Sequence, residues 1–351
     1  MPGSRGVLHR FTRTKNLTWL IVLLPLHAPA GVVLLYHHVN TSTPPITSIT
    51  PAQFDKHLEI IEAEAFTVLP LEQLVENSQK GVLDGKEVAI TFDDAYFSIY
   101  TEAFPRLRAR KWPFTIFVAP SHIGNGKLYL TWDQLKEMSE AGAAIENHTM
   151  THTHMIRLMN EETRAVWRQR MLDEIQTASA LLTQHDFVSR HFAYPYGEYN
   201  LELLAIIESL GLTGYGQQSG AIGPLSDTRL LPRFPLSGGY VGESAFRDKL
   251  KSLSLPVKPA IVEPLVEQDY KPKLLLAFED ESVALDRLTC YGPGGLMNLT
   301  LNNRTVTATP LNEVPVGRSR YNCTLPQGSR YYWISQLWLR KRADGTWYPE
   351  P

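Results

Sequence analysis

The sequence has few cysteines and no excess of charge of one sign, and both shortages exclude whole classes of protein. Only two of its 351 residues are cysteine, so it is neither a cysteine-rich zinc module nor a small scaffold held together by many disulfides. Its 34 basic and 36 acidic residues give a formal net charge of -2, with no long run of either sign. The sequence therefore predicts no nucleic-acid partner. Any metal ion must be bound by histidine, aspartate or glutamate.

A basic segment and a short apolar run lie near the N-terminus. Four basic residues precede an apolar stretch at 17–26, and Ala28 and Ala30 form a small-x-small cleavage site, which is typical of a secretory signal. We therefore predict a signal peptide over residues 1–30 and a secreted or periplasmic mature chain that begins near Gly31. The alternative is an uncleaved membrane anchor, since apolar residues continue over 32–35, although prolines at 25 and 29 argue against a spanning helix.

From residue 31 to about residue 255, short β-like runs alternate with helix-like stretches. This alternation predicts an α/β fold with parallel strands. The expected strands are residues 32–36, 66–69, 87–92, 114–118, 143–147, 191–194 and 212–216. Seven such units suit a closed or nearly closed barrel better than an open sheet, although periodicity alone does not separate the two.

Several helix boundaries can be recognised inside this region. Thr50 and Thr131 are each followed three residues later by glutamine, a capping pattern that predicts helices starting at both positions. Asn160 is expected to open a longer polar helix. A further apolar helix face over 203–210 is expected to end at Gly211.

The character of the sequence changes after residue 255. Prolines mark a linker, and short β-like runs with glycine and asparagine turns follow. We predict a linker and small accessory β domain over 256–351. Cys290 and Cys323 lie in this segment; they could pair after export or remain two unlinked residues. Aromatic residues near the end could stack on sugars, but core positions are the favoured interpretation.

Two adjacent carboxylates follow the apolar strand over 87–92. The run Thr91-Phe92-Asp93-Asp94 puts both at a strand's carboxyl end, where barrel folds gather their reacting groups. One carboxylate can bind a metal while the other stays ionised as a base. Taken alone, the pair would more simply be a helix cap or a solvated loop.

A second group of polar residues follows the strand over 143–147. In His148-Thr149-Met150-Thr151-His152, the two histidines stand four residues apart, so on one helical turn both imidazoles could reach one ion, with zinc as the first choice. His154 is offset and is expected either to orient a ligand or to face solvent. Histidine pairs are usually structural, but the coincidence with Asp93 and Asp94 favours a metal site.

Two further strand ends complete the candidate site. The stretch Tyr194-Pro195-Tyr196-Gly197 forms a turn that could wall a sugar site and aim backbone N–H groups at an oxyanion, or simply end a strand. His37 and His38 follow the first expected strand, where one imidazole could serve as a general acid.

On these motifs the sequence resembles the polysaccharide deacetylases of carbohydrate esterase family 4, also called the NodB-homology family. The resemblance covers roughly residues 32–255 and implies a distorted (β/α) barrel. It implies a divalent metal, usually zinc, bound by Asp94, His148 and His152. It also implies Asp93 as catalytic base and a backbone N–H of the third motif, here that of Tyr196, as oxyanion donor.

The sequence departs from the family pattern in two places. Many members carry an arginine just before the proline turn to pair with the base, whereas residues 192–195 read Phe-Ala-Tyr-Pro. Arg233 is the candidate substitute, with an ordinary surface arginine as the alternative. The leucine-x-histidine motif also has no clear match late in the region. In a permuted subgroup similar to deacetylases of exported poly-N-acetylglucosamine, an early histidine takes its place, and we assign His37 rather than His38 because neighbouring strand residues face opposite sides.

The resemblance thus implies a metal-dependent hydrolase that removes N-acetyl groups from an N-acetylglucosamine-containing polysaccharide. Its partner would be the N-acetylated glycan, and a membrane only if the N-terminal segment stays uncleaved. Two alternatives remain open at this point. One is an O-acetyl carbohydrate esterase with the same motifs, and the other is a non-catalytic glycan-binding protein on the same barrel.

Overall fold

The computed structural model describes residue 3 and residues 30–257, 261–281 and 283–349. Almost all of the expected signal peptide, residues 1–30, lies outside this part of the chain. Among the residues that are described, none belongs to a helix long and apolar enough to cross a membrane.

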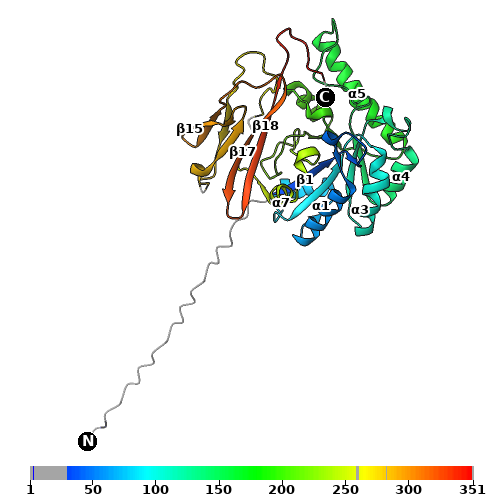
Figure 1. The fold of residues 1–351 in the computed structure, drawn as a ribbon, viewed down its shortest axis with the longest axis horizontal. Helices are drawn as coiled ribbons and strands as arrows, with labels where there is room; N and C mark the ends of the chain where they lie inside the picture. Colours follow the sequence, from blue (N-terminus) through cyan, green and yellow to red (C-terminus); the bar gives the residue numbers. More distant parts are fainter. Residues whose placement is uncertain (1–2, 4–29, 258–260, 282, 350–351) are drawn as a thin grey trace.

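Within residues 30–257, eight parallel strands form one curled sheet (Figure 1). The strands lie in the order β10 (Phe234–Pro235), β1 (Gly31–Tyr36), β5 (Glu87–Phe92), β6 (Phe114–Val118), β7 (Ala143–Asn147), β8 (His191–Ala193) and β9 (Thr213–Tyr215), with β4 (Thr67–Val68) paired to β5. Leu231 forms a parallel bridge with Tyr215 of β9, at one edge of the sheet. Three residues later the same segment forms β10, which pairs with β1 at the other end. This segment nearly closes the curl, which confirms the predicted distorted (β/α) barrel.

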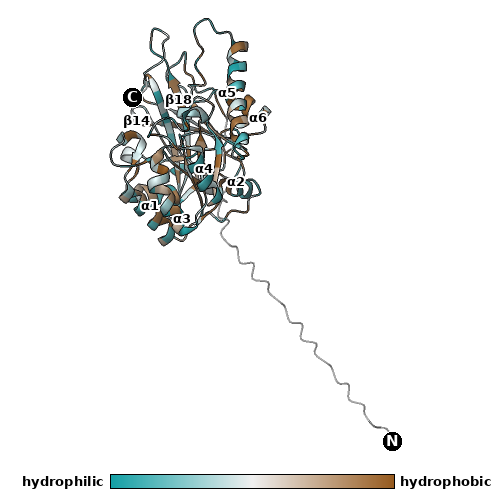
Figure 2. Cartoon of the chain, turned by 90° about the vertical axis from the view of Figure 1, so that its right-hand side faces the viewer, coloured by the Kyte–Doolittle hydropathy of each residue, from teal (hydrophilic) through white to brown (hydrophobic). Residues whose placement is uncertain are grey.

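Helices surround the sheet. They are α1 (Pro51–Ala63), α2 (Leu71–Gln79), α3 (Phe104–Arg110), α4 (Trp132–Glu140), α5 (Arg164–Gln184), α6 (Leu201–Ser209) and α7 (Glu243–Leu250). In Figure 2 the labelled helices α1 to α6 carry both hydrophilic and hydrophobic residues, as expected when one face packs on a core. Shorter elements are β2 (His38–Val39), β3 (Ser48–Ile49), 3₁₀ turns at Pro45–Thr47, Pro120–His122, Pro195–Gly197, Gly238–Tyr240 and Leu285–Arg287, and a π-helical turn at Ile99–Ala103.

The capping patterns hold at two of the three expected helix starts. Thr50 and Thr131 both form complete capping boxes with the glutamine three residues on. The expected start at Asn160 is wrong, because α5 begins at Arg164 with Thr163 as its cap. Glu162 instead accepts the Met159 N–H at 2.9 Å, so the residues before Thr163 form a turn rather than the first turn of the helix.

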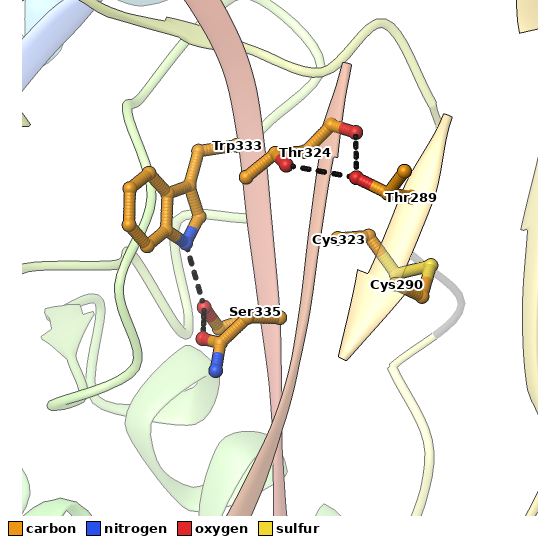
Figure 3. The surroundings of a disulfide bond; sticks show 7 residues. Thr289, Cys290, Cys323, Thr324, Trp333 and Ser335 are labelled. Carbon is orange, nitrogen blue, oxygen red and sulfur yellow. Dashed lines mark hydrogen bonds between the residues drawn. A yellow bond between two sulfur atoms is a disulfide. The ribbon is translucent and has the colours of Figure 1, made fainter. Parts of the chain in front are cut away.

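The described C-terminal residues form two further sheets. Five strands lie in the order β11 (Ser252–Ser254), β18 (Arg330–Arg340), β17 (Gly317–Gln327), β13 (Thr289–Gly292) and β14 (Gly295–Leu296), and three in the order β12 (Leu274–Ala277), β16 (Thr305–Thr309) and β15 (Asn298–Asn302). We call residues 261–349 the C-terminal β unit. A disulfide joins Cys290 to Cys323 across β13 and β17 (Figure 3).

The C-terminal β unit packs directly on the barrel. Strand β11, from before the expected boundary at residue 255, pairs in parallel with β18. Leu337 and Leu339 of β18 belong to the same apolar cluster as Leu203 and Ile207 of α6. Three of the six terminal aromatic residues, Tyr332, Trp338 and Tyr348, are buried as expected for core positions, two are half-buried, and Tyr331 is 42% exposed. The unit is therefore continuous with the barrel core.

Candidate active site

Asp93 and Asp94 lie where β5 ends. The Asp93 amide donates to the carbonyl of Tyr36, the last residue of the neighbouring strand β1, at 3.0 Å. Asp94 and Ala95 then both adopt positive φ angles, of 70° and 55°. Such backbone conformations are costly for residues other than glycine and recur at functional sites. Here they turn the chain sharply, and both carboxylates are buried.

Asp93 forms a buried, two-pronged ion pair with Arg233. The two guanidinium nitrogens donate to the two carboxylate oxygens at 2.7 and 2.8 Å, and neither side chain is exposed. Burial alone would raise the pKa of Asp93, but the charge of Arg233 and the Arg233 hydrogen bonds outweigh it and lower the pKa. Arg233 is therefore not the surface arginine considered as an alternative. It lies where an arginine could hold a base ionised.

His148 and His152 gather around Asp94. One Asp94 oxygen, Oδ1, lies 3.4 Å from His148 Nε2 and 3.0 Å from His152 Nε2. The three residues form a group whose ligand atoms all lie within 4.8 Å of one another. The structure thus brings together the three metal ligands that the sequence resemblance implied.

The backbone that presents these histidines differs from the prediction. They do not lie on one helical turn, because residues 148–152 form a loop with positive φ at Thr149 (66°) and His152 (55°). The Thr149 amide donates to the Asn147 side chain at 2.8 Å, and Thr151 binds Glu174 of α5 through its amide and hydroxyl. Local hydrogen bonds of this kind compete with helix formation.

The donor set fits a divalent cation. His148 Nδ1 lies 2.7 Å from the carbonyl oxygen of Ala193, and because a carbonyl only accepts, Nδ1 carries the proton of the neutral ring and Nε2 presents a lone pair. Asp94 Oδ1 and His148 Nε2 are both buried, with no hydrogen-bond partner among the described residues. When the His148 ring is neutral, these two atoms are both acceptors, and at 3.4 Å they repel each other unless a cation lies between them. Imidazole nitrogens with one carboxylate are typical zinc ligands.

His37 and His38 follow β1, and the charge of Asp94 acts on both of them. Burial lowers the pKa of His37, while the charges of Asp94 and Asp93 partly oppose this shift. His38 instead stacks on Tyr96, with ring centroids 3.6 Å apart. His37 therefore interacts with both carboxylates, whereas His38 interacts with that of Asp94.

The turn after β8 borders the metal-ligand group. Pro195 begins it, and Tyr196 has a φ of 60°. The Tyr196 ring meets the His152 ring edge-to-face at 4.6 Å and stacks flat on His154 at 3.8 Å. His154 also binds Glu198 at 2.8 Å, so it does not simply face solvent.

Three aromatic groups beside the site were missed by sequence reasoning. Tyr96 stacks with Tyr129, with centroids 5.4 Å apart, and Tyr129 contacts the His122 ring at 4.8 Å. Tyr96 stands two residues after Asp94, which is the only sequence signal that could have placed it here. Tyr129 and His122 come from the segment after β6, which meets the chain after β5 at an isolated antiparallel bridge between Tyr96 and Tyr129.

Comparison with known proteins gives the class of this chain. The family model described as "Polysaccharide deacetylase" matches residues 80–215, which include β5 to β9 and all the motifs from Asp93 to Tyr196. Residues 80–215 therefore match a polysaccharide deacetylase domain of the NodB-homology type, as the motifs suggested. The chain is a hydrolase of that class.

Individual relatives extend the similarity beyond this segment. YxkH of Bacillus subtilis is 28% identical over 254 residues, which are 72% of this chain and 86% of that protein. A poly-β-1,6-N-acetyl-D-glucosamine N-deacetylase of Staphylococcus aureus is 26% identical over 197 residues, 54% of this chain and 68% of that protein.

Solved structures share the barrel. IcaB from Ammonifex degensii is 25% identical with a TM-score of 0.55, over 62% of this chain and 96% of that one. The Streptococcus pyogenes deacetylase PplD is 21% identical with a TM-score of 0.57, over 64% of this chain and 99% of that one. At this identity the second match supports the fold alone.

Proposed function

We propose that this chain removes N-acetyl groups from an N-acetylglucosamine-containing polysaccharide with the help of a divalent metal, for which zinc is our first choice. One observation carries the proposal. A buried carboxylate, Asp93, is paired with Arg233 next to a group of three metal-ligating side chains. Of the two adjacent aspartates, Asp93 is thus placed to act as the base and Asp94 to act as a metal ligand.

Asp94, His148 and His152 would hold the metal. When bound, it supplies a Lewis acid that polarises the acetyl carbonyl and makes a water molecule more acidic. Asp93, kept ionised by Arg233, takes the proton of the attacking water. The backbone N–H of Tyr196 donates to the oxygen that gains charge in the transition state.

The acid that completes the reaction is His37. It lies at the end of β1, next to the carbonyl that binds the Asp93 amide. In this proposal His37 protonates the departing amine, which allows the C–N bond to break. The products are acetate and a free amino sugar.

The substrate class rests on the relatives. The Staphylococcus aureus protein is named for N-deacetylation of poly-β-1,6-N-acetyl-D-glucosamine, and we assign the same class of glycan to this chain. We further propose that the protein is exported, on the strength of the secretory pattern over residues 1–30. The Cys290–Cys323 disulfide supports this, because such bonds persist mainly outside the reducing cytosol.

A substrate comparison tests the proposal. The zinc-loaded protein is incubated with N-acetylglucosamine oligomers and with O-acetylated xylan oligomers of matched length, and released acetate is measured. We expect acetate from the N-acetylated oligomers, with a free amine formed for each acetate. Release from the O-acetylated oligomers alone would instead establish an esterase.

A further inference from the structure

Glu198 is a buried carboxylate with partners from distant parts of the chain. Its side chain has no exposed surface. It lies two residues after Tyr196, and the Glu198 amide donates to the carbonyl of Pro195 at 3.1 Å. Glu198 is thus part of the turn that borders the metal-ligand group, although the proposed reaction does not use it.

Two of the groups that bind Glu198 come from the C-terminal β unit. The Tyr348 hydroxyl donates to Glu198 Oε1 at 2.6 Å, and Arg318 of β17 donates to the same oxygen at 3.3 Å. His154 of the barrel binds the other oxygen at 2.8 Å. Burial opposes ionisation, but these hydrogen bonds and the charge of Arg318 hold the pKa of Glu198 below its usual value. The buried, charged carboxylate of Glu198 therefore bonds to side chains of both the C-terminal β unit and the barrel.

The same partners also contact Tyr196. The His154 ring lies flat on the Tyr196 ring, 3.8 Å away with 7° between the planes. The guanidinium carbon of Arg318 lies 5.5 Å from the centre of the Tyr196 ring. Tyr196 is thus held by two residues that both bind Glu198.

Tyr196 needs such support because of its backbone. A φ of 60° is unfavourable for a residue with a Cβ atom, and strained conformations persist only where their surroundings fix them. The turn's own hydrogen bonds, from Gly197 to Tyr194 and from Glu198 to Pro195, are local.

We propose that Arg318 and Tyr348 are positioning residues of the active site, which act through Glu198 and His154 to hold the Tyr196 turn in its reactive geometry. This inference rests on the proposed function for its effect on turnover. It assigns the C-terminal β unit a part in organising the site, beyond that of an accessory glycan surface. Neither residue touches the reacting atoms.

Hydrogen exchange tests the positioning without any substrate. Two variants, Arg318→Met and Tyr348→Phe, each remove one bond to Glu198 and keep an apolar side chain. We expect amide exchange in peptides covering residues 194–200 to rise about tenfold, with peptides over β5 unchanged. Arg318→Lys, which keeps the charge, should recover part of the protection.

A matched control comes from the same pair of strands. Arg340 of β18 lies one position along the β17–β18 ladder from Arg318, and it binds Glu313 at 2.9 Å instead of Glu198. Arg340→Met should lower the stability of the β unit and leave exchange over residues 194–200 as in the wild type. If Arg340→Met raises that exchange as much as Arg318→Met does, the effect is general loosening and the inference is wrong.

Kinetics then separate positioning from binding. For Arg318→Met we expect kcat to fall about tenfold while KM and the zinc content stay close to wild type. If the wild-type protein released no acetate from any glycan, the proposed function would be contradicted. The hydrogen-exchange result would still test whether Arg318 and Tyr348 hold the Tyr196 turn in place. Unchanged exchange and unchanged kcat in both variants would overturn the inference.

Discussion

Asp93 and Asp94 are neighbours in the chain, yet their surroundings prepare them for different tasks. Asp93 faces a guanidinium and Asp94 faces two imidazoles. We expect Asp94→Ala to lose both zinc and activity, because it removes a charged ligand. Asp93→Asn should keep zinc and lower kcat by about 10² or more. Metal analysis of the purified variants checks this, and equal zinc retention in both would refute the division of roles.

Removal of Arg233 should strongly destabilise the fold. Replacing it with methionine leaves the Asp93 carboxylate buried without its partner, and breaking a buried pair in this way costs about 3–5 kcal/mol. We therefore expect Arg233→Met to lower the free energy of unfolding by about that amount. Adding Asp93→Asn should restore part of it, since no buried charge is then left alone. Urea denaturation of the single and double variants measures this coupling, and strictly additive losses would contradict it.

Single residues could be predicted from the sequence to different degrees. The proximity of Asp94, His148 and His152 was predictable because all three follow strand ends that meet at one edge of the sheet, and the family resemblance implied their role as ligands. Arg233 was only a candidate, since nothing local links it to a carboxylate 140 residues away. Glu198 was missed entirely, because its partners Arg318 and Tyr348 approach only through the packing of the C-terminal β unit.

At the scale of elements, the longer apolar runs in the sequence predicted strands correctly, whereas short segments did not predict the local structure. The expected strands correspond to β1 and β4 to β9 within one or two residues, because buried parallel strands form distinct apolar runs. Strand β10 was missed, since two residues carry no periodicity. The loop over residues 148–152 was taken for a helical turn because a spacing of four fits a helix, whereas bonds to Asn147 and Glu174 decide the backbone there.

We expect the disulfide to stabilise the pairing of two strands. It links β13 to β17 and closes a separation of 33 residues, and a crosslink of this span stabilises by about 3 kcal/mol when its geometry is unstrained. Replacing both cysteines by serine should lower the stability of the C-terminal β unit by about this amount. Denaturation followed by the fluorescence of the unit's tryptophans, such as Trp338, measures the loss. Identical midpoints for the two proteins would show that the sheets need no crosslink.

At the scale of the whole molecule, the barrel and the C-terminal β unit share packing surfaces. The ring of Trp333 meets Phe234 of β10 at 5.4 Å, and Gln336 binds the Tyr199 hydroxyl at 2.9 Å. A chain that ends at Leu255 loses these contacts together with the apolar side chains of β18. We expect its melting temperature to fall by more than about 10 °C. Calorimetry of the shortened and full chains measures this difference. An unchanged melting transition would show that the barrel's stability does not depend on the C-terminal β unit.

We propose that the whole molecule works as a metal-dependent N-deacetylase, and its activity before and after removal of zinc is the sharpest check. The protein is stripped with a chelator, reloaded with one equivalent of zinc, and assayed on poly-β-1,6-N-acetylglucosamine oligomers for acetate and free amine together. We expect both products to appear in equal amounts, to disappear on stripping and to return on reloading. Deacetylation that persists undiminished in the stripped protein, or its absence from the reloaded protein on every N-acetylated glycan tried, would contradict the claim.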